Sequence, residues 1–151
     1  MSNSNQNNLD LPRILDAANS AAAAASKVLL ARFRPDNSNP LDSFYKSPNA
    51  LVTDADLASD RAITEALKAA GAPGRILSEE SATVLSGSGD NDSLTWLVDP
   101  LCGTVPFSTG MDHWGVNIAL RSAGELVAAS LPLPSLGEQL SATRGNGVLR
   151  N

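Results

Sequence analysis

The stretch WGVNIALRSAGELVAASLPL, residues 114–133, decides the fold class. Its first half alternates apolar with small or polar residues, which is the two-residue period of a strand. The apolar positions are Trp114, Val116, Ile118 and Leu120. Ala123-Gly124 then offers a hairpin turn, and a second apolar face follows at Val127, Ala129, Leu131 and Leu133. This pattern predicts an antiparallel pair of strands.

Further strands are expected on both sides of this pair. Downstream, residues 139–143 predict a short strand, and Asn146-Gly147 is a strong hairpin signal. The return strand would start at residue 148 but reaches only Asn151, so we expect the sequence to be cut rather than finished. Upstream, residues 76–78 and 95–98 are short apolar runs that end on carboxylates.

Two long helices are expected before the strands. The first runs from about Leu11 to Arg34, with Asp10 as N-cap, a stripe of apolar residues at helical spacing, and Pro35 after its end. The second runs over residues 54–70, is capped by Thr53 or Asp54, and is stopped by Gly71 and Pro73. Residues 36–48 and 86–92 are expected to be loops. Together these elements predict an α+β fold, with two long helices layered on a largely antiparallel sheet.

Composition bounds the class of protein. The chain has 151 residues, 42% hydrophobic and 18% charged, which is typical of one globular domain. Its net charge of -5 argues against nucleic acid as a binding partner, since such proteins carry a basic footprint. One cysteine allows no intrachain disulfide, the N-terminus does not resemble a signal peptide, and the longest apolar run is too short to span a membrane. We therefore expect a cytoplasmic protein with no membrane partner.

Three acidic residues, Asp56, Glu79 and Asp99, lie at the boundaries of predicted elements. Carboxylates that converge at such boundaries suit Mg²⁺, which prefers oxygen ligands. Gly103-Thr104 would begin a helix whose amides accept a phosphate. Simpler interpretations stay open: an acid in the first turn of a helix for Asp56, a solvated strand end for Glu79, and an ordinary turn at Asp99.

Three phrases in order resemble the inositol monophosphatase family of Mg²⁺-dependent phosphatases. They are LVTDAD (residues 51–56), ILSEES (residues 76–81) and WLVDPLCGTVPF (residues 96–107). The likeness continues through Gly110, the segments 113–114 and 116–120, and residues 142–147. It covers nearly everything after residue 10, so we expect a disordered tail over residues 1–10 and the N-terminal domain of this family over residues 11–151, with the C-terminal domain absent.

The resemblance implies roles for single residues. By position, Asp56 and Thr104 would be catalytic and activate the attacking water. The backbone amides of Gly103 and Thr104 would bind the phosphate of the substrate. The implied metal ligands are Glu79, Asp99, Asp56 and the backbone carbonyl of Leu101.

Two departures from the family pattern matter. Cys102 stands where the family has a second metal-binding Asp, and a mostly neutral thiol is a poor ligand for Mg²⁺. The second and larger departure is length: family members are about twice as long, and the half that this chain lacks carries a further metal-binding Asp and much of the substrate pocket. A smaller difference is Ser78, which replaces the usual Gly before Glu79. His113 is expected to orient a loop, and Asp112, where the family often has Pro, is expected to be a surface residue.

The resemblance implies a Mg²⁺-dependent phosphomonoesterase, with Mn²⁺ as a substitute metal, that hydrolyses a small phosphorylated metabolite by metal-activated water. Relatives act on inositol phosphates, histidinol phosphate, sugar bisphosphates and nucleotide 3′-phosphates, and the sequence does not choose among them. The truncated chain alone is expected to be inactive or weak. The alternative is a non-catalytic half-domain that acts through assembly with a partner chain, which Cys102 and the early stop favour. We also expect self-association, as a homodimer or through the exposed edge of the sheet.

Overall fold

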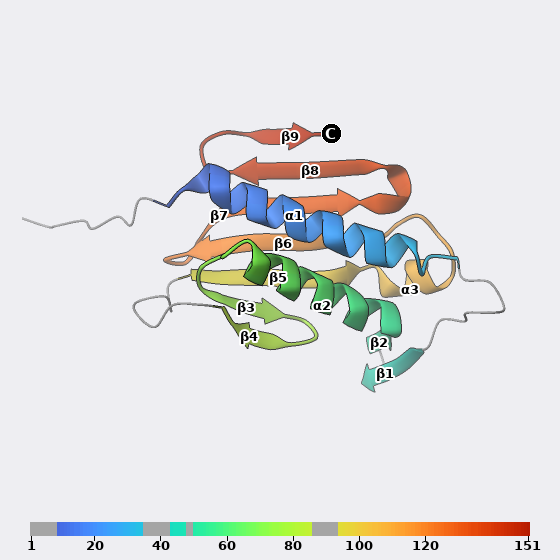
Figure 1. Cartoon of the computed structure of the whole chain (residues 1–151). Helices are drawn as coiled ribbons and strands as arrows, with labels where there is room; N and C mark the ends of the chain where they lie inside the picture. Colours follow the sequence, from blue (N-terminus) through green and yellow to red (C-terminus); the bar gives the residue numbers. More distant parts are fainter. Residues whose placement is uncertain (1–8, 35–42, 48–49, 86–93) are drawn as a thin grey trace, which may run out of the picture.

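The fold consists of two helices packed on one face of a seven-stranded sheet (Figure 1). It is described from a computed structural model that covers residues 9–34, 43–47, 50–85 and 94–151. Helix α1 spans Leu11–Leu30 and contacts the middle and later strands of the sheet, and helix α2 spans Asp54–Ala69 and contacts α1 and the central strand β5. The α+β fold with a largely antiparallel sheet is therefore confirmed.

The sheet is built in the order β4-β3-β5-β6-β7-β8-β9. Its strands are β3 (Arg75–Ser78), β4 (Ala82–Val84), β5 (Leu94–Cys102), β6 (Gly115–Ser122), β7 (Glu125–Leu133), β8 (Glu138–Thr143) and β9 (Val148–Arg150). Only β3 and β5 pair in parallel, and every other neighbouring pair in this sheet is antiparallel. Between elements lie the short helix α3 (Thr104–Ser108) and the 3-10 turn η2 (Pro134–Leu136).

Helix α1 forms because its start is capped and one of its faces is apolar. The Asp10 carboxylate accepts a hydrogen bond from the backbone N–H of Arg13, and Pro12 lies in the first turn. A stripe of small residues is fully buried: Ala18, Ala21, Ala22 and Ala25. Such side chains allow a helix to approach the strands closely, so α1 lies directly on the strands of the second half of the chain.

The two predicted hairpins are confirmed. Strands β6 and β7 are joined by Ala123-Gly124, whose φ angles of 48° and 87° fit the left-handed geometry of a tight hairpin turn. Strands β8 and β9 pair on either side of Asn146-Gly147. Hydrogen bonds in both directions between the backbones of Gln139 and Asn151 extend this last pairing by one residue.

Several boundaries differ from the prediction. Helix α1 ends at Leu30 rather than Arg34, because Phe33 turns onto the rings of Phe107 and Trp114 at centroid distances of 5.4 and 5.0 Å. The segment predicted as a loop over 36–48 contains strand β1 (Ser43–Ser47), which pairs with β2 (Ala50–Thr53) in a separate hairpin. Strand β4 was not expected, and β5 extends well beyond residues 95–98. The predicted loop at 86–92 and residues 1–8 of the predicted tail lie outside the described residues.

Within the part of the chain that the structure describes, no helix is long and apolar enough to cross a membrane.

Candidate functional site

The first turn of helix α2 presents a buried carboxylate to the start of helix α3. Asp56 is 3% exposed, and its Oδ2 accepts hydrogen bonds from the backbone N–H and the hydroxyl of Thr53, at 2.9 and 2.6 Å. The bond from the Thr53 N–H and a return bond from the Asp56 N–H to the Thr53 hydroxyl oxygen, at 3.4 Å, form a capping box, which orients the side chain from its own helix. The other oxygen, Oδ1, accepts a hydrogen bond from the hydroxyl of Thr104 at 3.0 Å. The structure thus brings the two predicted catalytic residues together across 48 positions of sequence.

Asp99 and the residues after it lie at the end of strand β5. The pairing of β5 with β6 shifts register between Asp99 and Cys102, so the end of the strand leaves the regular ladder. The Asp99 Oδ1 accepts a hydrogen bond from the backbone N–H of Leu101 at 3.2 Å. The Leu101 carbonyl lies 3.3 Å from the Thr104 hydroxyl, which joins this bulge to the Asp56 pair.

Gly103 makes the sharp turn from β5 into α3. Its φ angle of 93° lies in the left-handed region, and a Cβ atom there would lie 2.7 Å from the carbonyl oxygen of His113. Only glycine fits without strain or displacement. The predicted start of a helix at Gly103-Thr104 is confirmed, but α3 has only five residues, and phosphate binding by the two amides stays a prediction.

The turn that carries Glu79 is held by the backbone. The N–H of Ser78 donates to the carbonyl of Ser81 at 2.8 Å, and the N–H of Glu79 donates to the carbonyl of Val98 at 3.1 Å. The hydroxyl of Ser78 accepts a hydrogen bond from the N–H of Glu80 at 3.2 Å. Ser78, the departure from the family's Gly, therefore contributes a contact to the turn.

The electrostatics of the site centre on Asp99. Burial raises the pKa of its carboxyl above the ordinary value, and the negative charge of Asp56 adds to this rise. Hydrogen bonds from the Leu101 N–H and with the side chains of Cys102 and Glu79 oppose it. Cys102 is exposed at the surface, yet desolvation of its thiol, followed by the charge of Asp99, raises its pKa. Cys102 is therefore a neutral thiol at neutral pH.

The chemistry of this donor set fits a hard divalent cation. The carboxylates of Asp99 and Glu79 are in contact, Asp56 is close enough to act on Asp99, and partial burial disfavours the ionised form of Asp99 in the absence of a positive partner. The set is not complete, however. Within the described residues, no three His, Cys, Asp or Glu side chains converge closely enough to form a metal-binding group.

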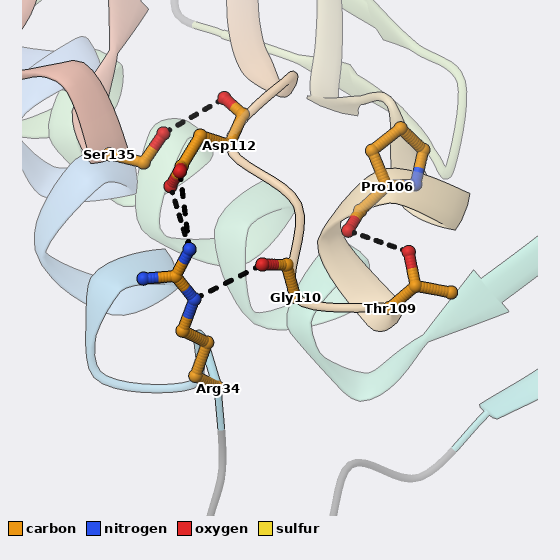
Figure 2. Close-up of polar contacts among 6 residues, drawn as sticks. All are labelled: Arg34, Pro106, Thr109, Gly110, Asp112 and Ser135. Atoms are coloured by element: carbon orange, nitrogen blue, oxygen red, sulfur yellow. Dashed lines mark hydrogen bonds and ion pairs between the residues drawn. The ribbon is translucent and has the colours of Figure 1, made fainter.

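The loop between α3 and β6 is tied to Arg34, in the segment that follows α1, as Figure 2 shows. The Arg34 guanidinium donates to both carboxylate oxygens of Asp112 at 3.2 Å and to the carbonyl of Gly110 at 3.1 Å. The carbonyl of Asp112 accepts a further bond from the hydroxyl of Ser135 at 3.0 Å. Asp112 is a partly exposed residue, but it also anchors a loop. Sequence reasoning missed Arg34 because its partner lies 78 positions away.

A groove of about 470 Å³ opens beside the site. It is lined by Cys102, Asp112, His113, Trp114, Gly115 and Asn117 together with Leu131, Leu133 and Leu136. That the His113 side chain orients a loop stays a prediction. Its backbone carbonyl packs against Gly103, so this loop borders the turn that leads to Thr104.

Comparison with known proteins agrees with this arrangement. The model of the inositol monophosphatase family matches residues 10–151, nearly the whole chain. The chain belongs to the inositol monophosphatase family. It is 35% identical over 106 residues to an inositol-1-monophosphatase of Rhizobium meliloti, covering 70% of this chain and 39% of that relative. It is 32% identical over 138 residues to the Nus factor SuhB of Pasteurella multocida, covering 91% of this chain and 50% of that relative. The chain thus spans about half the length of its curated relatives.

The solved structures of the family show the same fold. The SuhB protein of Bartonella henselae aligns with a TM-score of 0.81 at 30% identity, over 91% of this chain and 52% of that one. An IMPase/NADP phosphatase described as complexed with Mg²⁺ and phosphate aligns with a TM-score of 0.74 at 17% identity, over 95% of this chain and 52% of that one. At that identity the likeness shows the fold alone.

The relatives correct one expectation. We excluded nucleic acid as a partner from the acidic composition, and this exclusion is wrong, because several relatives are named as Nus factors. Net charge describes the average surface of a chain. It does not decide whether a family member works in an assembly that contains nucleic acid.

Proposed function

We propose that this chain carries the water-activating and metal-binding part of a Mg²⁺-dependent phosphomonoesterase, which hydrolyses a small phosphorylated metabolite. The observation that carries the proposal is the hydrogen bond from Thr104 to the buried carboxylate of Asp56. That carboxylate is already oriented by Thr53, so it is a fixed acceptor with no freedom to turn away.

The two residues form a relay for one proton. A water that donates to the Thr104 oxygen is made more nucleophilic as Thr104 donates in turn to Asp56. The water oxygen then bonds to phosphorus as the bond to the ester oxygen breaks on the opposite side. The proton of the water passes through Thr104 to Asp56, and the leaving alkoxide takes up a proton from solvent and departs as the alcohol. No covalent bond to the protein is needed.

The metal ligands of the proposal are Glu79, Asp99, the carbonyl of Leu101 and Asp56. A bound Mg²⁺ would polarise the phosphoryl oxygens and lower the pKa of the attacking water. The proposal assigns phosphate binding to the backbone amides of Gly103 and Thr104. Cys102 supplies no hard oxygen, so we expect a weaker second metal position than one built from a carboxylate.

Phosphate release tests this proposal, measured with and without Mg²⁺ on residues 1–151 joined to the C-terminal half that the curated relatives carry. The panel of substrates is an inositol monophosphate, histidinol phosphate, a sugar bisphosphate and a nucleotide 3′-phosphate. Thr104→Val removes the hydroxyl that bonds Asp56, and Thr109→Val is its matched control, because the Thr109 hydroxyl bonds only the backbone of α3. We expect Thr104→Val to lower the rate by about 100-fold, the scale of general base catalysis, and Thr109→Val to leave it unchanged. Equal rates for the two variants would exclude the proposed relay.

A second candidate is a non-catalytic protein that acts by assembly with a partner, as the Nus factor names of several relatives suggest for those proteins. The specific observation in its favour is Cys102 with a raised pKa beside Asp99, since a neutral thiol does not replace a metal-binding carboxylate. Absence of Mg²⁺-dependent release from every ester in the panel would favour this candidate.

A further inference from the structure

Helix α2 has three polar residues on a buried face. Asp56, Ser59 and Asp60 are 3%, 0% and 7% exposed, and their spacing places them on one side of the helix. Buried polar groups are costly unless they are hydrogen-bonded. The role of Asp56 is part of the proposed reaction, whereas Ser59 and Asp60 have no part in it.

Ser59 binds the irregular end of strand β5. Its hydroxyl donates to the carbonyl of Pro100 at 2.6 Å, across 41 positions of sequence. Pro100 lies between Asp99 and Leu101, within the stretch where the register of β5 against β6 shifts. The regular hydrogen bonds between β5 and β6 therefore do not hold this stretch in place, and the hydrogen bond from the Ser59 hydroxyl does so instead.

Asp60 binds the turn that carries Glu79. Its Oδ2 accepts a hydrogen bond from the hydroxyl of Ser81 at 2.7 Å. The carbonyl of Ser81 in turn accepts the N–H of Ser78, so this turn of four residues is closed on itself and tied to α2 at one end. Glu79 lies inside it.

We propose that Ser59 and Asp60 are positioning residues, which set the Asp99–Leu101 segment and the Glu79 turn in register with Asp56. One face of α2 then contacts three segments of the site: through Asp56 to Thr104, through Ser59 to Pro100, and through Asp60 to Ser81. Neither Ser59 nor Asp60 is among the proposed metal ligands or catalytic residues. The expected effect on Mg²⁺ binding rests on the proposed function, since the aligned segments carry the proposed metal ligands.

The contacts predict a separate local effect for each residue. Ser59→Ala would loosen the Pro100 segment and leave the Glu79 turn in place, whereas Asp60→Ala would do the reverse. A residue that supports only overall stability would loosen both segments together. Ser26→Ala is the matched control, because its hydroxyl donates at 2.7 Å to the carbonyl of Ala22 within helix α1.

Amide hydrogen exchange of the metal-free chain, followed by a calorimetric titration with Mg²⁺, tests the proposal. In Ser59→Ala we expect the Leu101 amide to exchange about tenfold faster, with the Ser78 and Glu79 amides unchanged. In Asp60→Ala we expect the Ser78 and Glu79 amides to exchange faster and the Leu101 amide to stay unchanged. Mg²⁺ affinity should fall by about tenfold or more in both, as when partners of metal ligands are lost, and stay unchanged in Ser26→Ala.

Asp60→Asn separates the hydrogen bond from the charge. The Asn carbonyl can still accept the Ser81 hydroxyl, so this variant should keep the slow exchange of the Glu79 turn. Fast exchange in Asp60→Asn, equal to that in Asp60→Ala, would overturn the proposed contact, as would equal acceleration of both segments in either Ala variant. Because exchange is measured without metal, it decides the positioning role by itself. A parent chain that binds no Mg²⁺ would instead contradict the proposed function.

Discussion

Cys102 stands beside Asp99, and the negative charge of Asp99 helps to raise the pKa of its thiol. A carboxylate at position 102 would offer Mg²⁺ a hard oxygen in place of a neutral sulfur. In Cys102→Asp, made in the chain extended by the C-terminal half that its relatives carry, we therefore expect the Mg²⁺ concentration for half-maximal phosphate release to fall. Cys102→Ser is the control, because it removes the sulfur without adding a charge. An equal or higher Mg²⁺ requirement in Cys102→Asp would show that the site is adapted to the thiol.

Asp99 gives a second expectation, for stability. Burial raises the pKa of Asp99 above 3.8, so the folded chain holds this proton more tightly than the unfolded chain does. Burying the ionised carboxylate lowers the free energy of unfolding. This loss of stability is absent below pH 3.8, appears as the pH rises through the raised pKa of Asp99, and is complete above it. Without metal, Asp99→Asn should therefore melt at a higher temperature than the parent at neutral pH, and this advantage should shrink on acidification. A difference in melting temperature that does not change with pH would contradict this account.

For single residues, the sequence predicts which side chains form the site, but not which hydrogen bonds position them. Asp56, Thr104 and Asp99 were predicted from motifs, and the structure brings Asp56 and Thr104 into hydrogen-bond contact. The supporting contacts of Ser59 and Asp60 were not predicted. A serine or an acid on a helix face has many ordinary uses, and only the tertiary structure shows that the partner is 41 or 21 positions away.

Among the elements, the turn into α3 depends on Gly103. Gly103 and Gly124 both have positive φ angles, of 93° and 87°, but only at Gly103 would a Cβ meet backbone atoms. Gly124→Ala should cost about 1 kcal/mol, the strain of the left-handed conformation. Gly103→Ala should cost that amount and about 1–3 kcal/mol more for overpacking. Chemical denaturation of both variants measures the difference, and equal losses would show that the His113 loop yields at little cost.

Elements with a strong period or a strong turn signal were predicted well. The hairpins at 123–124 and 146–147 and helix α2 follow from local chemistry that no distant contact overrides. The predicted end of α1 was wrong and strand β1 was missed, and the reason is different. Phe33 leaves the helix for the rings of two residues far along the chain, and β1 exists through its pairing with β2.

In the whole molecule, one face of the sheet carries an apolar row away from the two helices. The row crosses six strands in register through Leu77, Leu97, Ala119, Ala129, Ala142 and Val148. Its ends are open to solvent, with Leu77 50% and Val148 69% exposed, and the last strand β9 is exposed throughout. Exposed apolar rows and open strand edges favour association.

We therefore expect the 151-residue chain to self-associate. Sedimentation over a concentration series should show the oligomer, and Val148→Lys, which places a charge at the edge of the row, should shift it toward monomer. Leu126→Lys is the matched control, because Leu126 is also exposed but lies beside the β6–β7 turn. A parent that stays monomeric at high concentration would contradict the expectation.

A calorimetric titration of the chain with Mg²⁺ tests most directly whether Asp99 helps to bind a catalytic Mg²⁺. Asp99→Asn removes one charge at the site, and Asp16→Asn removes one charge from the exposed side of α1. We predict saturable binding to the parent and to Asp16→Asn, and no detectable binding to Asp99→Asn. Binding of equal strength to the parent and to Asp99→Asn, or no binding to the parent, would contradict the account.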